Sequence, residues 1–120
     1  MDVLNTLYDT LAGFGLPVYL QGSMADDEPY PDVFFTYYNN NSTGARYYDD
    51  LENAVVWDFD VNVYAANPDT AQTMLMQARD SLRALGFVCP GAGYDIISDE
   101  PTHTGRGINA TYIERVTQNG

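Results

Sequence analysis

The strongest constraint on the fold of this chain is the alternation of side chains over residues 54–65. One set is apolar and consists of Val55, Trp57, Phe59, Val61 and Val63; the other is Val56, Asp58, Asp60, Asn62 and Tyr64. Successive side chains of a β-strand point to opposite faces, so the pattern predicts a half-buried antiparallel strand. We expect Trp57, Phe59 and Val61 in the core, and Asp58, Asp60 and Asn62 on a face that meets water or a polar partner.

Two helices are predicted on either side of this strand in the sequence. The first covers residues 2–12, where Leu4, Leu7, Tyr8 and Leu11 recur at helical spacing before Gly13. The second begins at Asn67-Pro68-Asp69, which supplies a cap, a first-turn proline and an acid for the helix dipole. Its apolar stripe is predicted to be Ala71, Met74, Leu75, Ala78, Leu82 and Leu85, and Gly86 ends it.

Shorter patterns complete the predicted fold. Further strands are expected over residues 17–21, 33–38, 87–89, 93–98 and 107–116. With two strands formed from the three candidates that follow the second helix, the predicted order is α-β-β-β-α-β-β within a single domain covering residues 1–120. This order predicts an α+β fold, with an antiparallel-dominated mixed sheet and both helices packed on one face.

A polar stretch from Asn39 to Asn53 separates two of these strands. It carries Tyr47, Tyr48, Asp49 and Asp50. Long loops without secondary structure are uncommon in compact domains unless they bind something or stay flexible, and exposed tyrosines make good contact residues. The alternative is a wide hairpin whose tyrosines pack back on the sheet.

Charge narrows the possible partners. The chain has 17 acidic residues against five arginines and no lysine, for a net charge of −12. Such a chain has little to neutralise phosphates with, which disfavours direct binding of DNA or RNA. Three explanations fit this excess of acidic residues. It could serve solubility alone, it could keep the protein from adhering to DNA, or it could let the protein imitate DNA.

Several kinds of chemistry have no signature in the sequence. The one cysteine, Cys89, excludes an intramolecular disulfide and a cysteine-based metal cluster, and we interpret it as a buried small apolar residue. No phosphate loop, dinucleotide fingerprint, nucleophile elbow or zinc signature occurs, so we expect neither a cofactor nor an enzyme. No apolar run approaches the roughly 20 residues of a membrane-spanning helix, and the N-terminus lacks the basic head of a signal peptide. No membrane partner is expected.

Two groups of polar residues could carry chemistry. Asp58 and Asp60 would lie about 7 Å apart on one strand face. This pair of carboxylates could serve acid–base or metal chemistry, or it could simply belong to a face in contact with water. Residues 98–107 bring four charged or titratable residues close together in the sequence: Asp99, Glu100, His103 and Arg106. The segment could be a binding site, or it could be a polar turn in which Gly105 and Gly107 have a positive φ.

Within residues 98–107, His103 and Arg106 each have alternative roles. His103 could act as a base beside Thr104 in a hydrolase, or fix its own loop by bonding to backbone or a carboxylate. Arg106 could pair with Asp99, with Glu100, or with an acid on a neighbouring subunit, since arginine forms bidentate bonds to carboxylates.

The same residues carry a resemblance to a known family. The run from Asp99 to Gly107 (DEPTHTGRG), followed by Tyr112-Ile113-Glu114, resembles a segment near the C-terminus of small tail proteins of phages and prophages of Gram-positive bacteria. Upstream matches are Tyr30-Pro31 before Phe34-Phe35-Thr36-Tyr37, Tyr47-Tyr48-Asp49, Val55-Val56-Trp57 and Gly86-Phe87. The resemblance covers residues 14–116 and is strongest with the tail-completion, or tail-terminator, proteins of long-tailed phages.

The resemblance implies an α+β virion protein without catalytic residues. Its copies would form a ring, usually of six, that caps the tail tube and joins it to the head. Partners would be the tail tube protein and a head-completion or stopper protein, with DNA passing through unbound, and assembly would occur in the cytoplasm of the host bacterium. Alternatives are a head–tail connector or stopper protein, an acidic DNA-mimicking inhibitor, and a hydrolase using His103.

This reading assigns the candidate residues to surfaces. The candidate lumen or polar sheet face comprises Asp58, Asp60 and Asn62. The candidate interface to a neighbouring subunit or to the tail tube comprises Tyr47, Tyr48, Asp49, Asp50, Asp99, Glu100, His103 and Arg106.

Overall fold

The computed structural model describes residues 2–24, 28–45 and 54–115, and it has the predicted α+β order. The elements are α1 (Val3–Ala12), β1 (Val18–Leu20), β2 (Val33–Ala45), β3 (Ala54–Ala65), α2 (Pro68–Ala84), β4 (Tyr94–Ile96) and β5 (Thr104–Arg115). The described strands form one sheet in the order β1-β2-β3-β5-β4. Only the β1–β2 pair is parallel, so the sheet is mixed and mostly antiparallel, as predicted.

Both helices begin where the sequence predicts. The Asp2 side chain caps α1 by accepting a hydrogen bond from the Asn5 backbone N–H at 3.1 Å. The Asn67 side chain caps α2 through the Asp69 N–H at 2.8 Å, with Pro68 in the first turn. After α2 the chain reverses at Gly86, whose φ of +99° is a conformation that glycine adopts without steric cost.

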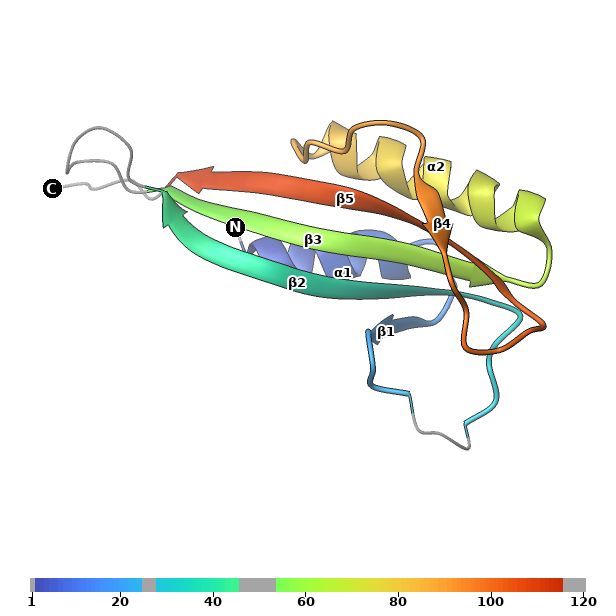
Figure 1. The fold of residues 1–120 in the computed structure, drawn as a ribbon. Coiled ribbons are helices and arrows are strands. Elements are labelled where there is room, and N and C mark those ends of the chain that lie inside the picture. Colours follow the sequence, from blue (N-terminus) through green and yellow to red (C-terminus); the bar gives the residue numbers. More distant parts are fainter. Residues whose placement is uncertain (1, 25–27, 46–53, 116–120) are drawn as a thin grey trace, which may run out of the picture.

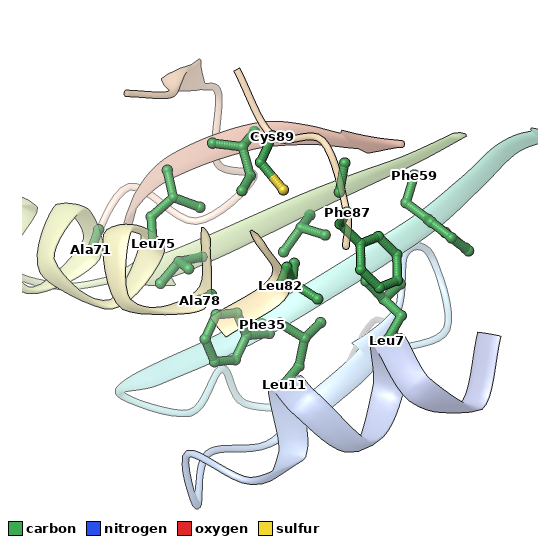
Figure 2. Close-up of a cluster of buried hydrophobic side chains, with 14 of the residues drawn as sticks. Leu7, Leu11, Phe35, Phe59, Ala71, Leu75, Ala78, Leu82, Phe87 and Cys89 are labelled. Atoms are coloured by element: carbon green, nitrogen blue, oxygen red, sulfur yellow. The ribbon is translucent and has the colours of Figure 1, made fainter. Parts of the chain in front are cut away.

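The two helices cover the same face of the sheet and enclose the core (Figures 1 and 2). The buried positions of α2 are Ala71, Leu75, Ala78 and Leu82, and those of α1 are Val3, Leu7 and Leu11. They pack on a strand layer that includes Phe35, Phe59, Val61, Val63, Ile108 and Ala110. Cys89 lies in this core, as predicted.

The edges of the predicted helix stripes need correction. In α1 the buried series begins at Val3, while Leu4 and Tyr8 lie toward solvent. In α2, Leu85 is the residue after the last helical turn and is 46% exposed. Both departures occur because the sheet contacts one narrow line of each helix, and apolar residues beside that line stay at the margin.

The strand β2 is longer than predicted. β2 continues through the asparagine-rich stretch to Ala45, paired with β3 as far as Ala54, so residues 39–45 form a hairpin strand rather than a loop. Cross-strand pairing with the strongly patterned β3 outweighs the low strand propensity of asparagine. The register shifts between Asn39 and Asn41, a bulge that accommodates one extra residue.

The start of β5 overturns the predicted turn at the two glycines. Gly105 and Gly107 lie within β5, and neither has a positive φ. Because they have no side chain, the two glycines allow neighbouring residues to pack closely against β5. A Cβ on Gly105 would come within 2.8 Å of both the Tyr64 ring and the Ile96 carbonyl oxygen.

The long strands form an elongated body. β2, β3 and β5 run side by side and extend beyond both helices at one end of the molecule (Figure 1). β1 and β4 flank the other end of these strands, where β4 pairs with β5 at residues 105–107. The molecule measures 53 × 27 × 23 Å along its principal axes. The sheet is therefore widest at one end and narrows to three strands at the other.

Candidate functional site

The sheet face opposite the helices carries the predicted acidic pair. Asp58 and Asp60 both lie on this face, half-buried between neighbouring side chains. The Asn109 side-chain amide donates to Asp58 Oδ1 at 2.5 Å, and the Tyr94 hydroxyl hydrogen-bonds to Asp60. Burial and the charges of Asp60 and Asp58 raise the pKa of Tyr94. The negative potential of the pair therefore reaches across β5 to β4.

Asn62 lies on this face, as predicted, but it is buried there and does not reach water. It is only 3% exposed, and its amide nitrogen donates to Gln21 Oε1 and Thr36 Oγ1, each at 3.3 Å. Within the described residues, Asn62 Oδ1 has no hydrogen-bond partner. The reason for its burial is the extra width of the sheet here, since β1 and β4 flank the long strands and Ile96 lies over Gly107.

A pocket of about 460 Å³ opens on the same face at this wide end. Its aromatic wall is centred on Phe34, whose ring stacks on Tyr64 with centroids 5.2 Å apart. Tyr30 and Tyr19 meet Phe34 edge-on at 5.1 and 5.8 Å. The remaining lining residues are Leu20, Gln21, Gly22, Met24, Thr36, Ile96, Ile97, Asp99 and Glu100. An aromatic wall with a few polar groups is the usual composition of a ligand pocket.

His103 holds the acidic segment of this pocket in place. Its Nε2 lies 2.8 Å from the Pro31 carbonyl oxygen and therefore donates to it, and its Nδ1 lies 2.8 Å from Thr102 Oγ1. Its ring packs edge-on against Tyr30 at 5.1 Å. Within the described residues no carboxylate bonds to His103. This geometry matches the loop-fixing role considered from the sequence and leaves the imidazole without the orienting acid that a base normally uses.

Asp99 and Glu100 come to the pocket through that anchored segment. Both are exposed and line its rim. Burial and the charges of Asp99 and Glu100 raise the pKa of Tyr30, and burial together with Tyr30 and Asp99 raises that of Tyr64. The two carboxylates thus place a negative field over an aromatic surface.

Arg106 points away from these acids, toward the helix side of the sheet. Its Nε donates to Gln72 Oε1 at 2.8 Å, its Nη1 to Asp95 Oδ1 at 2.8 Å, and its Nη2 to the Ala92 carbonyl oxygen at 3.1 Å. Its carboxylate partner is thus Asp95 of β4, not Asp99 or Glu100. The three bonds tie α2, the chain before β4, and β5 together within one subunit.

Residues predicted as one interface are therefore separated. Asp99, Glu100 and His103 gather at the pocket, while Arg106 lies on the other face. Tyr47, Tyr48, Asp49 and Asp50 lie outside the described residues. Sequence reasoning missed the pocket tyrosines, although Tyr64 stands on the polar side of the strand alternation, a position that signals an aromatic residue outside the main core.

The comparisons with known proteins add no family assignment. No protein-family model matches the chain, and no curated protein matches it. Among the described residues, no group of three His, Cys, Asp or Glu side chains is placed to hold a metal ion. Neither described helix is long and apolar enough to cross a membrane.

Proposed function

We propose that this protein is a tail-terminator, or tail-completion, subunit of a long-tailed phage. Copies of it form a ring that caps the tail tube and joins it to the head, assembled in the host cytoplasm and retained in the virion. The observation that carries the proposal is the acidic sheet face without helical cover, in a chain of net charge −12 whose motifs resemble that class. The ring's other partners are the tail tube protein and a head-completion or stopper protein.

The acidic face suits a channel for DNA. Asp58 and Asp60 project from the middle of β3, about 7 Å apart along the strand. Like charges repel over about 8–10 Å at ordinary ionic strength, so a lumen lined by these carboxylates keeps phosphates from adhering. DNA would pass through such a ring without specific binding.

The shape suits a subunit that meets different neighbours at its two ends. Ring closure joins two unlike patches on each copy. The wide end carries the pocket and the segment anchored by His103, while at the narrow end the part of the chain that the structure describes consists of β2, β3 and β5. A 53 Å long subunit separates these two surfaces well enough for one to face a neighbouring copy and the other the tube or the head.

Electron microscopy of the purified protein, with its mass in solution, tests the ring. We expect a closed ring with a central opening and a mass several times 13.3 kDa. A protein that stays monomeric or dimeric at high concentration would contradict the proposal, and a monomer that competes with DNA for a DNA-binding protein would instead identify a DNA mimic.

Charge reversal tests the assignment of the lumen. The Asp58→Lys/Asp60→Lys ring should retain DNA that the unaltered ring releases. The Asp9→Lys/Asp80→Lys ring has the same change in charge on exposed helix positions and should not. Thermal unfolding of each variant shows that it has folded. Equal DNA retention by both rings would show that Asp58 and Asp60 do not line the channel.

A further inference from the structure

We propose that the pocket at the wide end of the sheet binds an arginine side chain presented by another protein. The proposal concerns the pocket bounded by Tyr19, Tyr30, Phe34, Tyr64, Asp99 and Glu100. It stands on the geometry and charge of these residues and does not depend on the proposed role in a phage tail.

The size and walls of the pocket fit a side chain with part of its backbone. A volume of about 460 Å³ lies within the range of sites that enclose small ligands. The wall is a set of interlocked aromatic rings, with Phe34 held between Tyr64, Tyr30 and Tyr19. Phe34 itself is buried, so the partly exposed rings of Tyr19, Tyr30 and Tyr64 are the surface against which a planar guanidinium would stack.

Asp99 and Glu100 supply uncompensated charge at the rim. Neither carboxylate forms an ion pair within the described residues. The three arginines whose side chains the structure describes bind other groups: Arg79 binds Asp80 and the Gly91 carbonyl, Arg83 the Cys89 carbonyl, and Arg106 Asp95, Gln72 and the Ala92 carbonyl. None of these three cations pairs with Asp99 or Glu100, so the rim is open to a cationic side chain of a partner protein.

The pKa shifts of two pocket tyrosines are in the direction expected beside the negative charge of the rim. Burial raises the pKa of Tyr30 and of Tyr64; Asp99 adds to the rise at both tyrosines, and Glu100 adds to it at Tyr30. A cation held between the wall and the rim would gain both ring and carboxylate contacts. Because the guanidinium is planar and forms two parallel bonds to carboxylates, arginine fits this combination better than lysine does.

Apolar residues beside the acids indicate a protein rather than a small cation. Ile97 is 92% exposed and Leu20 is 47% exposed, both at the pocket margin. Exposed apolar side chains next to a charged pocket are typical of interaction surfaces. The segment anchored by the His103–Pro31 bond keeps the rim in position. The partner is thus expected to present an arginine beside an apolar residue.

The test is an NMR titration of the full chain with three small probes. Acetyl-arginine methylamide should shift the methyl signals of Ile96 and Ile97 in a saturable way. Acetyl-citrulline methylamide, which is neutral and similar in shape, should shift them little, and acetyl-lysine methylamide should bind more weakly than the arginine probe. The proposal would be overturned if the citrulline probe shifted these signals as much as the arginine probe does. It would also be overturned if the arginine probe mainly shifted the signals around Asp58 and Asp60.

Two charge-neutralised variants complete the test. Asp99→Asn/Glu100→Gln should weaken arginine binding at least about tenfold, while Asp9→Asn/Asp80→Asn, which removes two exposed acids elsewhere, should leave it unchanged. Undiminished binding by the first variant would overturn the proposal. So would loss of self-association in that variant without any probe, because the occupant would then be a second copy of this chain. Absence of a ring with an intact titration would reject only the proposed function.

Discussion

Gly107 of β5 lies directly across from Asn62 of β3, and a Cβ at position 107 would overlap the Asn62 side-chain oxygen. Asn62 is itself bonded to Thr36 and Gln21, so it cannot swing aside without breaking those contacts. The glycine is therefore required by the space above β5 rather than by its φ angle.

Gly107→Ala should destabilise the protein. The added methyl meets a buried amide and the side chain of Ile96, and overpacking of this kind costs about 1–3 kcal/mol. Chemical denaturation measures the change. Gly13→Ala is the control, because Gly13 is exposed and has a helical φ of −64°; its added Cβ would lie 3.3 Å from the Asp9 carbonyl oxygen, which is a tight contact without the overlap found at position 107. Equal losses in the two variants would show that the contact with Asn62 is not the cause.

Phe59→Ala should cost more stability than Trp57→Ala. Phe59 is fully buried, and its truncation is expected to cost about 3–5 kcal/mol. Trp57 was expected in the core, but it lies only partly buried at its margin, stacked on Phe59 and donating to Glu114 at 3.0 Å. Denaturation of both variants checks the order. A larger loss at Trp57 would contradict this placement of the core.

Arg106→Ala should lower the stability of the single subunit and leave any assembly intact. The side chain makes three bonds within the subunit, but its partner Asp95 is largely exposed, and an exposed pair contributes about 0–1 kcal/mol. Arg106→Lys should recover part of the loss, since lysine cannot reach three acceptors in one plane. Thermal unfolding and light scattering separate the two effects. Loss of assembly with unchanged subunit stability would place Arg106 at an interface.

His103→Ala should loosen residues 98–103 without unfolding the domain. The Nε2–Pro31 bond is one part-buried hydrogen bond, worth about 0.5–1.5 kcal/mol. Amide exchange over this segment should rise, whereas exchange in α2 should not. His103→Gln retains a donor and is expected to leave assembly unaffected. A purified protein that hydrolyses an ester, peptide or nucleotide and loses this activity in His103→Gln would instead make His103 catalytic.

Cys89 should make the protein less stable as the pH rises. Burial raises the pKa of its thiol, against a smaller lowering by Arg83 and Arg79. Above the unfolded thiol's pKa of about 8.5, the unfolded chain has lost a proton that the folded chain keeps, so stability falls until the folded pKa is reached. Cys89→Ala lacks this contribution. The two stabilities measured from pH 7 to 10 should therefore converge or cross, and parallel curves would contradict the shift.

Local patterns were sufficient for the two helices and the central strand of this fold. The alternation in residues 54–65 predicts β3 and its buried face, and the Asn67 cap lies where the helix-start signal places it. These features depend on interactions between residues a few positions apart, so a single sequence displays them. The acids Asp58 and Asp60 could be placed on one face for the same reason.

The pocket and the true surroundings of Asn62, Gly107 and Arg106 were decided by the tertiary structure. Parallel pairing of β1 with β2 brings Tyr19 beside Phe34, and pairing of β4 with β5 brings Ile96 over the glycines. The sequence by itself determined the two helices, the central strand β3 and the apolar face of that strand. Only the tertiary structure decided which polar residues are buried, because strand neighbours distant in the chain leave no periodic signal along it.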